Sequence, residues 1–218
     1  MQPALAHRHW RILGRSALAR AAGRWSLVAA LAVSINGCRS VSPVDTKPLD
    51  DAGMTYDSIR ELKAHNITAL EVAQVAAARS AGVSDATCVV LLKIFHDRQQ
   101  PFNAGDATAG LSQARVGEDT IVELARLNEL GLPSGEFQAM RLAGLSDATV
   151  LAVARHRAAN QPVLSGASLA GLKNIGVREA TLLELARRGV PDSKAREIGY
   201  FRRRGGTDAE ILGHFAGS

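Results

Sequence analysis

The residue with the clearest chemical role in this sequence is Cys38, because it directly follows an apolar run. Residues 26–37 read Ser-Leu-Val-Ala-Ala-Leu-Ala-Val-Ser-Ile-Asn-Gly, and the residues before them include five arginines and no acidic residue. A basic region followed by a short apolar run and a small residue is typical of a secretory signal peptide. The run is too short to span a bilayer, which takes about 20 residues.

The last four residues of this segment, Ile35-Asn36-Gly37-Cys38, resemble the lipobox of bacterial lipoproteins. Asn36 departs from the small or β-branched residues usual at its place, whereas the other three match. The resemblance implies that acyl chains such as palmitate are attached to Cys38, which becomes the new N-terminus and holds the protein at a membrane. An Asp directly after the lipidated cysteine resembles a signal for retention in the inner membrane, but here that residue is Arg39. The resemblance therefore implies that the protein is sorted to the periplasmic face of the outer membrane. An ordinary cleaved signal, an uncleaved anchor and a cytoplasmic protein stay open as alternatives.

A second chemically distinctive group is a basic stretch near the C-terminus. Residues 187–204 hold seven Lys and Arg against two Asp and Glu, a net charge of 7 − 2 = +5. Within it we single out one possible contact patch of four arginines: Arg196, Arg202, Arg203 and Arg204. Such a patch suits anionic lipid headgroups, an acidic partner or nucleic acid. The alternative is a set of solvated arginines at helix ends.

One short segment indicates a possible role in nucleic-acid binding. Residues 169–180 resemble the helix-hairpin-helix motif of DNA-binding proteins at Ile175, Gly176 and Ala180, but Asn174 replaces the first glycine. The chain has 26 Lys and Arg against 21 Asp and Glu, and the segment 1–38 holds five of the basic side chains, which leaves 26 − 5 = 21 against 21. Non-specific DNA affinity depends on phosphate neutralisation by Lys and Arg. We therefore keep nucleic-acid binding only as the alternative function.

No catalytic or metal-binding spacing stands out in the sequence. The histidines after Cys38 each stand alone and at different offsets: His65, His96, His156 and His214. The other cysteine, Cys88, aligns with apolar residues of related segments, which predicts a buried apolar role. The sequence therefore predicts no catalytic residue, no metal and no cofactor.

The elements that carry these residues are predicted by a repeated turn. Ala143-Gly144-Leu145-Ser146-Asp147-Ala148-Thr149 returns almost unchanged at 81–87, and further copies centre on Arg115 and Gly176, with weaker ones at Asn66 and Gly205. From Gly82 onward the turn positions are therefore 82, 115, 144, 176 and 205. This regular spacing, a period of roughly 30 residues, is typical of a helical array. The first step, from 66 to 82, is about half as long, so we expect the array to start out of register.

Each copy has the local chemistry of a helix, a tight turn and a new helix. Glycine at the turn suits a positive φ, the following Ser or Thr suits an N-cap, and the next Asp or Glu suits the first turn of a helix. Apolar residues recur at steps of three and four on both sides of the turn, and Pro- and Gly-bearing breaks join the units.

The prediction is an all-α fold of about ten short helices packed as repeated helical hairpins. The expected domains are a signal peptide with lipobox (1–38), a flexible tether (39–54) and an α-helical repeat domain (55–216). For the function we expect a non-enzymatic, lipid-anchored scaffold or protein-binding module of the cell envelope, held at the membrane by Cys38 and bound to an envelope protein. An enzyme whose site is assembled across repeats is a third hypothesis.

Overall fold

The computed structural model describes residues 44–131 and 134–216, and in these ranges it contains α-helices, one 3₁₀ turn and no strand. The compact unit to which they belong runs from Ser42 to Ser218. Its elements in chain order are α1 (Lys47–Asp51), α2 (Tyr56–Ala64), α3 (Ala69–Ser80), α4 (Asp85–Asp97), α5 (Gly105–Gln113), α6 (Glu118–Arg126), α7 (Ser134–Leu142), α8 (Asp147–Ala158), α9 (Gly166–Asn174), α10 (Glu179–Arg187), η1 (Asp192–Lys194), α11 (Ala195–Arg203) and α12 (Asp208–Phe215).

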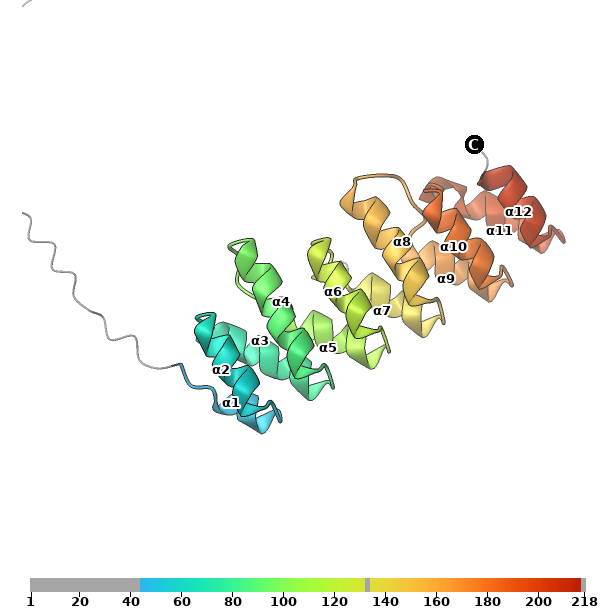
Figure 1. The fold of residues 1–218 in the computed structure, drawn as a ribbon. Coiled ribbons are helices and arrows are strands. Elements are labelled where there is room, and N and C mark those ends of the chain that lie inside the picture. The colour runs from blue at the N-terminus through green and yellow to red at the C-terminus, as the bar shows by residue number, and fades with distance from the viewer. Residues whose placement is uncertain (1–43, 132–133, 217–218) are drawn as a thin grey trace, which may run out of the picture. The chain divides into compact units, whose positions relative to one another are not determined.

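The helices form two layers that follow chain order. Each odd-numbered helix packs on the next odd-numbered one from α1 to α11, and each even-numbered helix packs on the next even-numbered one from α2 to α12. Figure 1 shows the same succession, with each helix pair beside the pair before it. The predicted all-α hairpin array is therefore confirmed, with twelve α-helices in the described residues where about ten were expected.

The edge at which an odd-numbered helix turns into an even-numbered one is called the corner edge. At each of its corners one residue has a positive φ: Gly53, Gly82, Arg115, Gly144, Gly176 and Gly205. A polar residue after the corner caps the next helix in most repeats, as where Ser146 Oγ accepts the N–H of Thr149. The repeated turn of the sequence is this corner.

The predicted start out of register is wrong. Asn66 has a positive φ, but it lies at the opposite edge, here called the loop edge, where even-numbered helices lead into odd-numbered ones. Its counterparts there are Gln99, Asn128, Asn160 and Gly189. The first corner is instead Gly53, and its spacing to Gly82 equals that from Arg115 to Gly144. The array is therefore in register from its first helix pair.

The core between the two layers is built from aliphatic side chains. Fully buried examples from both layers are Leu91, Leu111, Leu145 and Leu182. Cys88 is buried among them at 1% exposure, in agreement with its predicted apolar role. Burial of this apolar surface is the main driving force that holds neighbouring repeats together.

The predicted flexible tether needs a correction in its second half. Residues 47–51 form α1, and Leu49 of this helix is completely buried in the core. Met54 is also buried, and Val44 packs against the core. The array therefore includes residues 44–54. The predicted signal peptide and Cys38 lie outside the described residues.

Candidate functional site

A carboxylate links each corner to the corner of the preceding repeat. Glu179 lies in the first turn of α10, and its Oε1 accepts hydrogen bonds from the backbone N–H of Ser146 at 2.9 Å and from the hydroxyls of Ser146 and Thr149 at 2.8 and 2.6 Å. Glu118 does the same two repeats earlier, where it accepts the N–H and hydroxyl of Ser84 and the hydroxyl of Thr87. Sequence reasoning places these acids only at helix starts and does not reveal the link.

The same link is made by aspartate at the other corners. Asp85 accepts the N–H of Thr55 at 2.8 Å, Asp147 accepts that of Gly117 at 2.8 Å, and Asp208 accepts that of Arg178 at 3.3 Å. Aspartate occurs in the shorter repeats and glutamate in the longer ones, which run from corner 82 to corner 115 and from corner 144 to corner 176. The residue type follows the repeat length, and this correlation is visible in the sequence once both features are compared.

A basic side chain three residues before most corners completes the link. Arg79 donates to the carbonyl of Gly53 at 3.2 Å, and Arg141 donates to that of Arg115 at 2.9 Å. Arg202 donates to the carbonyl of Gly176 at 2.6 Å and to that of Gly206 at 2.9 Å. Arg202, predicted as part of a contact patch, is therefore engaged within the array and half-buried.

The corner carboxylates are held in their ionised form. Burial by itself would raise the pKa of Glu118 and Glu179, but the hydroxyl and N–H donors that surround each carboxylate outweigh it and lower the pKa. Because such a group has its hydrogen-bonding capacity engaged and holds its negative charge firmly, it is poorly suited to take up a proton as a general base.

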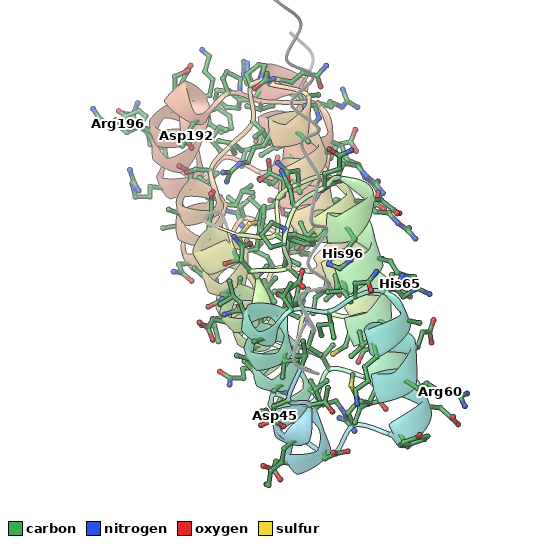
Figure 2. All side chains as sticks on the ribbon, turned by 90° about the vertical axis from the view of Figure 1, so that its left-hand side faces the viewer. Asp45, Arg60, His65, His96, Asp192 and Arg196 are labelled. Carbon is green, nitrogen blue, oxygen red and sulfur yellow. The ribbon has the colours of Figure 1, made fainter. Side chains whose placement is uncertain are left out.

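The remaining arginines of the predicted patch lie on or directly after α11. Arg196, Arg203 and Arg204 are exposed, and Figure 2 shows Arg196 extending away from the ribbon. Tyr200 lies between them and is 55% exposed, with the guanidinium carbon of Arg204 5.1 Å from the centre of its ring. Arg196, Tyr200 and Arg203 recur at steps of four and three, which places them on one face of the helix.

The histidines are not all isolated, contrary to the expectation from sequence. His96 donates from Nε2 to the Oε1 of Glu71 at 2.7 Å, and Glu71 is only 1% exposed. His65 and His96 both line a hollow of about 380 Å³ at the loop edge. Figure 2 labels the two residues. Burial would raise the pKa of Glu71, but the N–H groups of Phe102 and Thr68, together with His96, lower it.

This pair serves the packing of the loop edge. Glu71 accepts the N–H of Phe102 at 2.9 Å and so joins α3 to the segment that enters α5. Among the described residues there is no group of three or more His, Cys, Asp or Glu placed to hold a metal ion. His156 has a similar packing contact, where its Nε2 donates to the carbonyl of Arg187 at 3.0 Å. The ring of His214 lies against that of Phe201, with centroids 5.4 Å apart.

Cys88 is buried in α4, the helix that follows the second corner. Burial raises the pKa of its thiol to about 12, so it carries almost no thiolate near neutral pH. A thiol with these properties is a packing residue and not a nucleophile.

A search of protein families, of curated proteins and of solved structures finds no match to this chain. Within residues 44–131 and 134–216, no helix has the length and apolar character needed to cross a bilayer.

Proposed function

We propose that this protein is a non-enzymatic, lipid-anchored scaffold of the bacterial cell envelope. The observation that carries the proposal is the packing pattern, in which each helix contacts mainly its neighbours within a layer and its hairpin partner. Such arrays present a surface that grows with the number of repeats, and surfaces of this kind bind proteins or peptides. The corner carboxylates and the Glu71–His96 pair are used to join repeats, which favours a structural role for them over a chemical one.

The anchor in this proposal is Cys38, supported by the apolar run before it and by its lipobox resemblance. Val44 already packs against the core, so only the segment 39–43 connects the acylated cysteine to the array. A chain of this length spans at most about 20 Å when fully extended. The first helix pair would then be held close to the membrane surface.

The anchor is tested by blocking the lipoprotein signal peptidase in cells. The expected result is a larger precursor and a change in detergent partitioning, because acyl chains add strongly to membrane affinity. The Cys38→Ser variant is the matched control, since it keeps the apolar run and lacks the acylated thiol. A protein whose size and partitioning do not respond to either treatment contradicts the anchor.

The scaffold itself is tested by capture of the lipidated protein from envelope membranes, followed by mass spectrometry. The expected result is a set of envelope proteins enriched over those captured with an unrelated lipoprotein of the same anchor. Equal recovery with both baits contradicts the scaffold, whatever the state of Cys38.

The hydrogen bonds at the corners argue against the nucleic-acid alternative. The N–H groups just after the corners, which resemble those that meet phosphate in helix-hairpin-helix motifs, already donate to carboxylates of the following repeat at Ser84, Ser146 and Arg178. A carboxylate at this place repels phosphate.

A further inference from the structure

Helix α11 is the last member of the odd-numbered layer in the described residues, and one of its faces has no following helix. In the earlier odd-numbered helices the residue four places before the corner is buried. For two of these residues the next odd-numbered helix provides the cover: Met140 lies against Gly166 of α9, and Leu172 lies against Gly199 of α11. The equivalent residue of α11 is Phe201, which is only partly buried.

A hollow of about 380 Å³ marks this end of the array. It is lined by Tyr200, Phe201, Arg204, Gly205, Gly206 and Glu210. The exposed ring of Tyr200 and the edge of Phe201 give it an aromatic surface, and the Arg204 guanidinium lies over the Tyr200 ring. Exposed Tyr and Arg are among the residue types most enriched at the energetic centres of protein interfaces.

The charge at this end is positive and largely uncompensated. Arg196, Arg203 and Arg204 form no ion pair with the described carboxylates, whereas Lys194 pairs with Glu197 at 2.8 Å. In the even-numbered layer some basic residues pair between helices, as where Lys93 contacts Glu61 at 2.6 Å. Arg204 lines the aromatic hollow, and Arg196 and Arg203 are exposed on α11. Glu210, the carboxylate in the lining, accepts the N–H of Thr207. Arginines without a carboxylate partner beside an aromatic surface favour a ligand that carries both carboxylates and apolar groups.

We propose that this open end, formed by Arg196, Tyr200, Phe201, Arg203 and Arg204, binds an acidic amphipathic helix of a partner protein. The helix lies along α11 where a further odd-numbered helix would lie, with an apolar side chain in the hollow and carboxylates facing the arginines. The inference rests on the proposed scaffold function and names the place and the chemistry of its partner.

A second copy of the chain fits this end less well than an acidic helix. Arg79 and Arg141 each lie three residues before their own corner and donate to the carbonyl of the corner before it. At the first corner the equivalent residue is Asp50. In a head-to-tail contact Asp50 would meet the Gly205 carbonyl, and an acid and a carbonyl repel each other. In addition, Glu210 of the same chain already accepts the N–H of Thr207, the group that a following repeat would otherwise engage.

The test measures peptide binding to the full-length protein in bilayer nanodiscs by fluorescence anisotropy. The probe is a labelled helical peptide with Leu at steps of three and four and Glu elsewhere, and its match has Gln for every Glu. We expect the Glu peptide to bind at least about tenfold more tightly than the Gln peptide, and to lose about tenfold in affinity on triple replacement of Arg196, Arg203 and Arg204 by Glu. Tyr200→Ala should weaken both peptides, because it removes part of the hollow.

The matched control is Arg126→Glu, which reverses an exposed charge on α6 and should leave peptide binding unchanged. Equal affinity for the two peptides, or equal binding to the wild type and the triple variant, overturns the proposal. So does protection of α11 from hydrogen exchange in anionic but not in zwitterionic nanodiscs, since the arginines would then contact lipid. Self-association that the triple variant abolishes overturns it in favour of a second copy.

Capture from envelope membranes separates this inference from the function on which it rests. If the triple variant still captures the proteins that the wild type captures, the scaffold stands and the open end is not its binding site. If neither captures any protein above background, the scaffold fails, and the peptide measurement still decides whether the open end recognises acidic helices.

Discussion

The two edges of the array join repeats in different ways. At the corner edge five successive junctions use one device, a carboxylate that accepts the N–H group just after the preceding corner. At the loop edge the junctions use several devices: Glu71 binds the N–H of Phe102, Arg98 donates to the carbonyl of Ala125, and Asp192 accepts the N–H of Ser165. One of the loop-edge devices occurs twice, because Gln74 and Glu136 accept the N–H groups of Gly105 and Gly166. A uniform edge sets the spacing of repeats, and a variable edge then accommodates connections of different length.

The corner edge also shows how repeat length and side-chain length are matched. An aspartate suffices in the shorter repeats, such as that from Gly53 to Gly82, and the additional methylene of glutamate accompanies the longer ones, such as that from Gly144 to Gly176. Because the acceptor must reach one fixed N–H group, a side chain of the wrong length would leave a partly buried donor unsatisfied. The carboxylates therefore fix the register of one repeat on the next in addition to supporting the start of a helix.

Glu118→Ala is the most direct way to break the corner edge. It removes the acceptor of the Ser84 N–H and of two hydroxyls, so we expect unfolding free energy to fall by about 3 kcal/mol. The control is Glu123→Ala on the same helix, whose ion pairs with Arg126 and Arg155 lie at the surface and contribute less than about 1 kcal/mol. Denaturant titration of both variants gives the difference. Equal losses would mean that the corner carboxylate has no special role.

Replacing a glycine at each edge by alanine compares the stability lost to steric overlap at the loop edge with that lost to backbone strain at the corner edge. A Cβ on Gly105, at the loop edge, would lie 2.1 Å from the backbone oxygen of Gln74, so Gly105→Ala should cost about 2 kcal/mol or more. Gly82 at the corner has a φ of +91° and nothing within 4 Å of an added Cβ, so Gly82→Ala should cost only its backbone strain, about 1 kcal/mol. Thermal unfolding of the two variants tests this order, and a larger loss at Gly82 would reverse it.

The edges should also respond differently to pH. At the corner edge the pKa values of Asp85, Glu118 and Glu179 are lowered against the effect of burial, so their ionisation stabilises the fold above the ordinary carboxyl values. This contribution is lost as the pH falls below about 4.5 and through the lowered values. The loop edge is mixed. The pKa of Glu71 is lowered there as well, whereas burial raises the pKa of Glu129, so the ionisation of Glu129 opposes folding as the pH rises.

We therefore expect unfolding free energy to fall below about pH 4.5, with a shallower fall in Glu179→Gln, which lacks one of the titrating groups. Denaturant titrations from neutral pH down into the acid range measure the slope. An unchanged slope in this variant would place the acid sensitivity outside the corner edge.

The contrast between the edges explains how much of the fold follows from sequence. The corners repeat in residue type and spacing, so the all-α hairpin array is predictable from Gly82, Gly144 and their neighbours. Asn66 is predicted at the wrong edge because Asn-Ile-Thr satisfies the same local rules as a corner, and local rules do not say which layer a helix enters. The first pair escapes prediction because α1 has only five residues, too few to show a helical period.

In the candidate site, the sequence predicts which arginines lie at the surface but not which side chains contact distant parts of the chain. Arg196, Arg203 and Arg204 are expected at the surface and lie there, but composition alone groups Arg202 with them. Its packing depends on the carbonyl of Gly176, 26 residues earlier in the chain. The Glu71–His96 pair depends on a contact of the same kind, across 25 residues. The Glu71–His96 pair has no repeated sequence pattern. A basic residue three places before a corner does recur, at Arg79, Arg141 and Arg202, but its partner carbonyl is set only when repeats stack.

The smallest effect is expected at the last corner, where the link is weakest. The N–H of Arg178 reaches Asp208 at 3.3 Å, and the Arg178 guanidinium, whose side chain is 84% exposed, pairs with the same carboxylate at 3.3 Å. Arg178→Ala removes only the exposed ion pair and keeps the backbone donor, so we expect a loss within about 0.5 kcal/mol that disappears at high salt. Asp208→Asn should cost more, because it weakens the acceptor of the N–H group as well. If Arg178→Ala were as damaging as Asp208→Asn in denaturant titrations, the corner edge would owe its strength to surface ion pairs and not to the carboxylate–backbone bond.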